Sequence, residues 1–414
     1  MADRKDTAIL RELAKKVAEI SEQSIQEKRR DLWRKHNSLV RTRPLIYVRA
    51  FAWHEIFPDS LLECEDGFYR PYERYLREMI YRDTLGDDYI VEPWVTVKAV
   101  YRYPAQGLNY RWGPEIKTIP STEQRGSWKF DPPLKAPSDI NKLVRPRHVI
   151  DEEATVEKVG KLQDAIGDIL EVNVDRGPLY FMWMGDISTD FAYLRGLEQI
   201  MWDLFDHPEW LHQLAAFMRD SILTVHELAE EAGDWRLCNH QNQAMPYAQE
   251  LADPVANSQS VGRRQLWYFM ASQEFAQVSP QMFDEFLLQY QIPILEKFGL
   301  VAYGCCEDLT KKIDYLRRIP NLRRIAVAPW ADIRQCAEQI QEDYVLSWRP
   351  SPAEMVSTGF CPDRVRQMVR EAMQIFREHE NHVDITLKDV ETVQNNPDVV
   401  REWVKVVRDV VDEG

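Results

Sequence analysis

The sequence predicts an α/β fold, namely a TIM-type (β/α)8 barrel with an N-terminal helical extension and a long irregular insertion. From residue 178 onward, short apolar segments alternate with amphipathic segments of helical length, which is typical of a parallel sheet. The number of strand-like segments in the whole chain is near eight, which favours a closed barrel over an open sheet. Neither a G-x-G-x-x-G motif after a strand nor a P-loop is present, so the usual nucleotide-binding folds are not indicated.

Composition narrows the class of protein. The chain has 414 residues, of which 44% are hydrophobic, enough for one large domain or two ordinary ones. No run of ~18 apolar residues occurs and the N-terminus lacks the apolar core of a secretory signal, so we expect a cytoplasmic protein without a membrane-spanning helix. The net charge of −15 argues against broad nucleic-acid binding.

The first part of the chain predicts mostly helices around one strand. Residues 6–37 are rich in charge and predict one or two helices, either a solvated arm or a support for a homodimer. We therefore divide the chain into a helical extension, 1–40, and a barrel, 41–414, with an insertion at about 100–137. The expected elements up to residue 178 are a strand at 44–49, a helix at 68–82, an extended segment at 89–97, a short helix at 138–144 and a helix at 150–167.

Residues 101–137 mix proline, glycine, tryptophan and tyrosine without a clear period, as binding loops and lids often do. Trp112 and Trp128 either line a pocket there or hold the loop in place. Beyond residue 178 the expected strands are 179–184, 235–240, 300–305, 324–328, 344–347 and 382–387, and the expected helices are 191–204, 208–232, 280–298, 309–319, 331–341, 362–378 and 397–411.

The stretch most indicative of chemistry is 300–308, Leu-Val-Ala-Tyr-Gly-Cys-Cys-Glu-Asp. A buried strand ends there in two adjacent cysteines and two carboxylates, and the C-terminal ends of barrel strands are where such folds place metals and nucleophiles. By strand alternation Cys305 and Glu307 share a face with Tyr303, and Cys306 points the other way. The alternative is that Cys305 and Cys306 are buried core residues.

Two other segments carry possible metal ligands, Cys238 with His240 and the run 379–382. Thiolate and imidazole nitrogen suit Zn²⁺, which takes four ligands. His240 is equally well explained as a core histidine bonded to the backbone, and Cys238 is better explained as core. The candidate zinc ligands are His240, Cys305, Cys306, Glu307 and His382.

The remaining cysteines and arginines have simpler interpretations. Six cysteines without regular spacing do not indicate a disulfide scaffold, and Cys64, Cys336 and Cys361 are expected to be small buried side chains. Arg263 and Arg264 are expected in surface ion pairs. Arg349 lies at a strand end and is better placed to bind an anionic group.

Four stretches resemble the uroporphyrinogen decarboxylase superfamily, which includes cobalamin-dependent methyltransferases on the same barrel. They are Met184-Gly185-Asp186 with the helix at 191–198, the Ser-Pro segment at 271–290, residues 302–307 where methyltransferase members carry H-x-C, and 326–332 with 343–350. The resemblance extends from about Leu179 to the C-terminus and implies the barrel fold.

The sequence differs from the family pattern at positions that bind the substrate and the metal, and these differences narrow the range of expected substrates. Decarboxylases carry R-Q-A-G-R-Y near the start of the barrel, where this chain has Arg49-Ala50-Phe51-Ala52-Trp53-His54. One arginine remains, which matches a porphyrinogen with eight carboxylates poorly. Against the methyltransferase motif, Tyr303 takes the place of the histidine and Cys305 that of the cysteine. His382 lies near the position at which the methyltransferases carry a further cysteine ligand, so it could take the place of that ligand.

The resemblance implies a zinc-dependent methyltransferase that moves a methyl group between a small methoxylated or thiol substrate and a separate corrinoid protein. Zn²⁺ would act as a Lewis acid, with Tyr303 or Glu307 supplying a proton. The residues expected to bind substrate are Arg49, Trp53, His54 and Arg349. Two alternatives are a metal-independent decarboxylase or lyase on a small carboxylic acid, held by Arg49 and Arg349, and a non-catalytic barrel with the cysteines as core.

Overall fold

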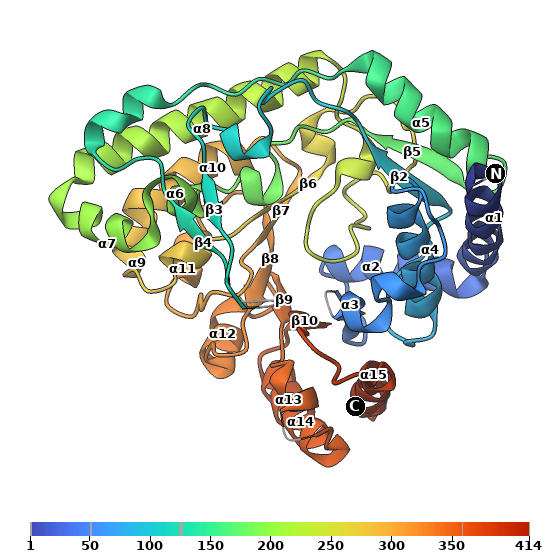
Figure 1. The fold of residues 1–414 in the computed structure, drawn as a ribbon. Coiled ribbons are helices and arrows are strands. Elements are labelled where there is room, and N and C mark those ends of the chain that lie inside the picture. Colours follow the sequence, from blue (N-terminus) through green and yellow to red (C-terminus); the bar gives the residue numbers. More distant parts are fainter. Residues whose placement is uncertain (1, 50–51, 124–126, 358, 414) are drawn as a thin grey trace.

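The computed structural model describes residues 2–49, 52–123, 127–357 and 359–413, and within them the parallel strands lie in two sheets (Figure 1). The larger sheet has six strands, in the order β1 (Leu45–Val48), β10 (His382–Leu387), β9 (Val345–Trp348), β8 (Leu322–Val327), β7 (Leu300–Tyr303) and β6 (Trp267–Met270). The smaller sheet pairs β2 (Trp94–Lys98) with β5 (Glu171–Asp175). Every pair in these two sheets is parallel, so the C-terminal strand ends of each sheet share one edge.

The strands of the larger sheet are buried on both faces, because helices and other strands cover both sides. All residues of β6, β7, β9 and β10 are buried. β6 and β7 are continuous apolar runs, as is typical of a covered parallel sheet, whereas β10 alternates polar and apolar residues. The predictions of a mixed α/β fold and of a parallel sheet are therefore confirmed.

No ladder joins the two sheets in the described part of the chain, so a hydrogen-bonded ring of eight strands is not shown. Irregular backbone occupies the gap between β5 and β6. The Gln241 amide donates to the Trp267 carbonyl at 3.3 Å, and the Val174 amide donates to Asn257 Oδ1 at 3.0 Å. The free edge of β5 is thus capped by a side chain instead of another strand.

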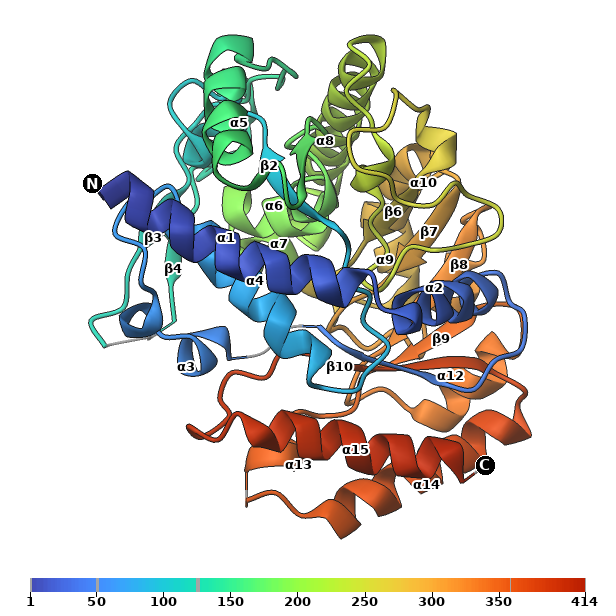
Figure 2. The ribbon, with the colours of Figure 1, turned by 90° about the vertical axis from the view of Figure 1, so that its right-hand side faces the viewer.

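The N-terminal segment forms two helices, α1 (Ala2–Ser21) and α2 (Ser24–Asn37), as predicted. α1 packs on α4 (Arg70–Asp83) and α5 (Glu152–Ile166), next to β2 and β5. Figure 2 shows α1 lying across α4. The apolar side chains of this group form a hydrophobic cluster separate from the main core. α5 begins where the sequence indicates, because the Asp151 carboxylate caps it by accepting from the Ala154 amide at 3.1 Å.

A buried polar network ties α2 to the larger sheet. Asp384, fully buried in β10, accepts hydrogen bonds from Arg324 at 2.7 Å, Ser347 at 2.8 Å and Thr386 at 2.9 Å, and contacts His36 at 3.2 Å. Burial alone would raise the pKa of the Asp384 carboxyl, but Arg324 and His36 hold it well below its usual range. The network therefore contains an ionised pair away from water.

The other helices surround the larger sheet. α14 and α15 pack against each other near β1 and β10 (Figure 2). α8 is the longest helix and packs on α7 and α10. These and the remaining helices are α3 (Trp53–Ile56), α6 (Ser188–Arg195), α7 (Leu197–Asp206), α8 (Pro208–Glu231), α9 (Pro280–Phe283), a π-helical turn (Asp284–Leu288), α10 (Gln289–Leu295), α11 (Ile313–Leu316), α12 (Ile333–Ile340), α13 (Ala353–Val356), α14 (Pro362–Glu378) and α15 (Asp398–Asp412).

Several predicted elements are wrong. The segments 179–184 and 235–240 are not strands but contain 3-10 turns, Met182–Met184 and Leu237–Asn239. The first is an apolar run, which a buried irregular segment produces as readily as a strand does. β5 and β6 were not predicted. The helix expected at 191–204 is two helices, because Gly196 at φ +91° interrupts it.

The insertion contains a short antiparallel hairpin of β3 (Lys117–Ile119) and β4 (Lys129–Asp131). It also contains two 3-10 turns, Leu108–Tyr110 and Pro137–Lys142. Trp112 is fully buried and its indole donates to Asp190 Oδ2 at 2.6 Å, so this tryptophan holds the insertion in place. Trp128 is 65% exposed. None of the helices in the described residues has the length and apolar character needed to cross a membrane.

Candidate active site

The turn after β7 brings the two adjacent cysteines to the C-terminal edge of the larger sheet. Gly304 adopts φ +94°, and a Cβ at this position would lie 2.5 Å from Leu309 Cδ1. Only glycine fits this conformation and this space without strain. Cys305 is buried at the end of the turn and Cys306 is half-buried, with their sulfurs 3.5 Å apart.

Glu307 shapes this turn from inside. Its Oε2 accepts from the Cys305 amide at 2.8 Å, and its Oε1 accepts from the Ser272 amide at 2.6 Å. The side chain is 2% exposed. Because both carboxylate oxygens accept hydrogen bonds from backbone amides, Glu307 fixes the position of Cys305 and does not face open space.

Lys388 reaches the thiols from the neighbouring end of β10. Its Nζ lies 2.9 Å from Cys305 Sγ and 3.0 Å from Cys306 Sγ. It also lies 3.0 Å from Asp389 Oδ2, and Cys306 Sγ lies 3.3 Å from the same oxygen. Two thiols, an ammonium and a carboxylate thus form one contact group. Lys388 is 4% exposed, whereas the Asp389 side chain is about half exposed to solvent.

The electrostatics of this group favour a thiolate on Cys305. A hydrogen bond from Cys306, together with the charges of Arg349 and Lys388, lowers the pKa of Cys305 to about 6 although burial opposes this. The same hydrogen bond and burial raise the pKa of Cys306. The two pKa shifts have opposite directions, so these contacts favour the negative charge of the pair on Cys305 and the proton on Cys306.

A cavity of about 260 Å³ opens beside the sulfurs, between the loops that follow β8, β9 and β10. Trp330, which is 66% exposed, stands at its rim. The cavity is lined by Cys305, Cys306, Pro329, Trp330, Arg349, Pro350, Ser351, Pro352, Lys388 and Asp389. It is large enough for a small molecule and gives it direct access to both sulfurs.

Two arginines add positive charge to this edge of the sheet. Arg349, 3% exposed, donates to the Cys305 carbonyl, and its buried Nε has no hydrogen-bond partner. Arg49 follows β1 and donates to Gln243 Oε1. Burial, and then the nearby Arg349 charge, lower the pKa of Arg49. Neither arginine has a carboxylate within ion-pair distance among the described residues, so the site favours an anion.

The structure does not bring the predicted histidine ligands to the thiols. His382 begins β10 and pairs with Val345 at the start of β9, at the opposite edge of the sheet from Cys305. A strand of six residues at about 3.3 Å per residue separates the two edges. His240 lies near the start of β6, where it accepts from the Trp267 amide at 3.2 Å and contacts the Ala252 carbonyl at 3.1 Å.

The predicted proton donor Tyr303 is also enclosed. It is 1% exposed, and its hydroxyl donates to Gln291 Oε1 at 2.6 Å. Gln291 in turn donates to the carbonyls of Asp186 at 2.6 Å and Ala271 at 3.0 Å. This network lies beneath the turn, and Tyr303 does not line the cavity.

The other candidate residues occupy different surroundings. Trp53 stacks on Phe57 with ring centroids 6.0 Å apart, and exposed His54 lies 3.7 Å from Glu55; neither Trp53 nor His54 lines the cavity. Ala50 and Phe51 lie outside the described residues. Arg263 pairs with Glu230 at 2.7 Å, as predicted, but it is buried and not at the surface, and Arg264 forms no ion pair with the described residues.

The simple expectation for the isolated cysteines holds in two of three cases. Cys64 and Cys336 are buried, whereas Cys361 is exposed, so the expectation for Cys361 is wrong. Cys361 directly precedes α14, where its thiol makes no capping hydrogen bond. It is therefore a free thiol remote from the cavity, useful as a reference for reactivity.

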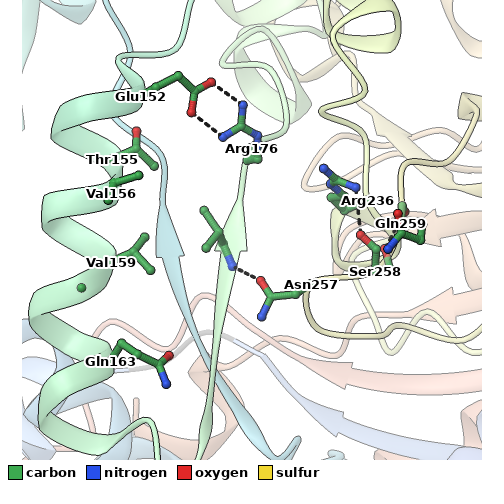
Figure 3. Close-up of a pocket in the computed structure, with 12 residues that line it drawn as sticks. Glu152, Thr155, Val156, Val159, Gln163, Arg176, Arg236, Asn257, Ser258 and Gln259 are labelled. Carbon is green, nitrogen blue, oxygen red and sulfur yellow. Dashed lines mark hydrogen bonds and ion pairs between the residues drawn. The ribbon is translucent and has the colours of Figure 1, made fainter.

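A larger hollow lies elsewhere on the molecule. A groove of about 530 Å³ runs between α5, β5 and the segment 257–259 (Figure 3). The Arg176–Glu152 ion pair, with its closest atoms 2.6 Å apart, crosses one end. Arg236 donates to the Ser258 carbonyl at 2.9 Å. The groove contains no thiol or histidine, and we assign it no function.

Sequence reasoning missed Lys388 and Asp389, although a usable signal exists. Both residues directly follow the strand predicted at 382–387, just as the cysteines follow theirs. The rule that side chains at the C-terminal ends of parallel strands meet at one edge would have selected them instead of His382.

Comparisons with known proteins leave the function open. No family model matches the chain, and no curated protein matches it. Among solved structures, a methyltransferase from Methanosarcina mazei is similar at 14% sequence identity with a TM-score of 0.47, covering 93% of this chain and 97% of that chain. A likeness of this strength leaves the fold and the site to be argued from the chain itself.

Proposed function

We propose that the thiol pair is the active centre of a methyltransferase, and that the enzyme moves a methyl group between a small anionic substrate and a separate corrinoid protein. The observation that carries the proposal is the Cys305 sulfur, held by Lys388 at 2.9 Å and open to a cavity of about 260 Å³. A thiolate in an accessible, cationic cavity is a nucleophile ready for transfer of a small group.

The donor set does not fit the zinc ion that the sequence resemblance implies. In the described residues no group of three or more histidine, cysteine, aspartate or glutamate side chains is arranged to hold a metal. The two sulfurs and Asp389 gather around the Lys388 ammonium, while His240 and His382 bind elsewhere. Zinc binding stays a prediction from the resemblance, and the reaction below does not use it.

In the proposed step the Cys305 thiolate attacks the methyl carbon of the substrate. A sulfur–carbon bond forms, the bond from the methyl carbon to the substrate heteroatom breaks, and its electron pair leaves with that heteroatom. The Arg349 and Lys388 charges stabilise the leaving anion. Cys305 would return to the thiolate when the sulfur–carbon bond breaks, its electron pair staying on the sulfur and the methyl group passing to a corrinoid that, in this proposal, a partner protein carries.

Isotope-labelled methyl donors test the proposal directly. We expect the intact mass of wild-type protein to rise by one methyl group after incubation with a methoxylated or methylthio substrate, and peptide analysis to locate the label on Cys305. Cys305→Ser should abolish labelling, and Cys361→Ser, which removes an exposed thiol outside the site, should not. Equal labelling of Cys361, or none on Cys305 with every donor of a broad panel, contradicts the proposal.

The unpaired arginines favour a second candidate, a metal-independent decarboxylase or lyase acting on a small carboxylic acid. Arg49 and Arg349 would bind the carboxylate, and no thiol would be required. Release of CO2 that persists in Cys305→Ser but is lost in Arg349→Met would favour this candidate over methyl transfer. If the cysteines react like ordinary thiols and neither methyl transfer nor CO2 release is detected, the non-catalytic barrel would be favoured.

A further inference from the structure

We propose that the Lys388 ammonium takes the position of a metal ion between the two sulfurs and Asp389, so that the thiol centre works without a metal. The inference rests on the proposed active site but not on the particular reaction assigned to it. It makes Lys388 a positioning residue that sets the charge state of Cys305.

The geometry of the ammonium carries this inference. A lysine ammonium has three N–H donors. Here three acceptors surround Nζ, Cys305 Sγ at 2.9 Å, Cys306 Sγ at 3.0 Å and Asp389 Oδ2 at 3.0 Å. Nζ donates to both sulfurs and forms an ion pair with Asp389, so one cationic centre already engages the two sulfurs and the carboxylate.

Burial makes this arrangement costly to disrupt. Lys388 is 4% exposed, and a buried ammonium needs nearby negative charge. The Asp389 side chain is 51% exposed, so solvent weakens its electrostatic attraction to the Lys388 ammonium. The Cys305 sulfur is buried and therefore supplies the better-shielded partner for the ammonium.

The surrounding charges oppose a divalent cation at the same place. Lys388 after β10 and Arg349 after β9 line the cavity beside the sulfurs, and the charge of Arg49 after β1 also interacts with Cys305. Asp389 and the enclosed Glu307 are the negative groups close to the turn. A zinc ion would add two positive charges to a cluster of three and would also require Cys306 to lose its proton.

The first test measures metal content and needs no variant. Wild-type protein is purified without chelator, incubated with zinc, desalted and subjected to elemental analysis. We expect zinc far below one ion per chain. One zinc per chain that is lost in both Cys305→Ser and Cys306→Ser, but kept in Cys361→Ser, would overturn the inference.

The second test follows the pH dependence of Cys305 alkylation by iodoacetamide, with peptide mass spectrometry as the readout. Lys388→Met keeps the length of the side chain and removes its charge. We expect the midpoint of the alkylation profile to rise by at least about one pH unit, from about 6, so that the thiolate fraction at pH 6 falls from about one half to about one tenth or less. Lys388→Arg should restore most of the profile, and Lys98→Met, at the exposed lysine that ends β2, should leave it unchanged.

An unaltered profile in folded Lys388→Met would overturn the inference, since a purely structural lysine would not set the thiol charge. Circular dichroism checks that the variants fold, and the metal measurement still decides if Lys388→Met does not. The outcomes also separate the two proposals. Zinc bound through the two cysteines of the wild type would overturn this inference and leave the methyl-transfer proposal open. A shifted alkylation profile in Lys388→Met without any methyl transfer would support this inference and contradict the methyl-transfer proposal.

Discussion

Replacing Asp384 by asparagine should destabilise the protein far more than the same change at the surface. Asp384 is fully buried and accepts from Arg324, Ser347 and Thr386. Asparagine keeps the shape but removes the charge, and it turns one acceptor oxygen into an NH2 group that faces donors. Arg324, 2% exposed, is then left as a buried charge without a counter-ion.

The expected magnitude follows from that burial. Removing one partner of a buried ion pair costs about 3–5 kcal/mol, a large part of the roughly 5–15 kcal/mol by which domains are usually stable. The matched control is Asp343→Asn, because Asp343 also pairs with an arginine, at 3.1 Å, but has a side chain 54% exposed. Solvent screening limits that surface pair to at most about 1 kcal/mol.

Urea unfolding followed by circular dichroism measures both variants against wild type. We expect a clear fall in the unfolding midpoint for Asp384→Asn and almost none for Asp343→Asn. Adding Arg324→Met to Asp384→Asn should recover part of the loss, because the double variant no longer buries an unpaired charge. Equal midpoints for Asp384→Asn and Asp343→Asn would refute the reasoning.

Three further predictions concern the turn, a buried histidine and the insertion. Gly304→Ala should lower stability by at least about 1 kcal/mol, because of its φ of +94° and the contact with Leu309, and should slow Cys305 alkylation in the folded protein. Burial lowers the pKa of His226 to about 3, so the unfolded chain binds one more proton below about pH 6.5 and stability falls as pH falls. His226→Phe should therefore reduce the slope of unfolding free energy between about pH 6.5 and 4 by up to about 1.4 kcal/mol per pH unit; parallel curves would contradict this. Asp190→Asn should raise protease cleavage within the insertion and cost about 3 kcal/mol or more, measured by urea unfolding, because Asp190 binds the buried Arg111 and Trp112.

The sequence predicts the larger sheet better than the smaller one, for a physical reason. β10 and α14 match their predicted bounds, 382–387 and 362–378, because one is a continuous buried strand and the other a strongly amphipathic helix opened by Pro362. β5 reads Glu-Val-Asn-Val-Asp and has only two fully buried residues, so it carries little apolar signal. Its place is set by pairing with β2 and by the cap from Asn257, contacts that no local pattern records.

For the site, local sequence located the thiols but not their partners. Cys305 and Cys306 stand out because an apolar run ends in them. Whether a histidine or a lysine meets them depends on which end of β10 lies at that edge, which the parallel register decides. The enclosure of Tyr303 by Gln291 and the use of Glu307 by backbone amides are tertiary facts of the same kind.

The separate hydrophobic cluster of α1, α4, α5, β2 and β5 has a consequence for how the protein opens. Because no ladder connects β2 and β5 to the larger sheet, the amides of this part can exchange with solvent through a subglobal unfolding event that leaves the six-stranded sheet intact. We expect hydrogen–deuterium exchange to show two levels of protection. The thiol centre is built on the ends of β7, β9 and β10, so its strands belong to the slower-exchanging unit, and local opening of the other would not dismantle it.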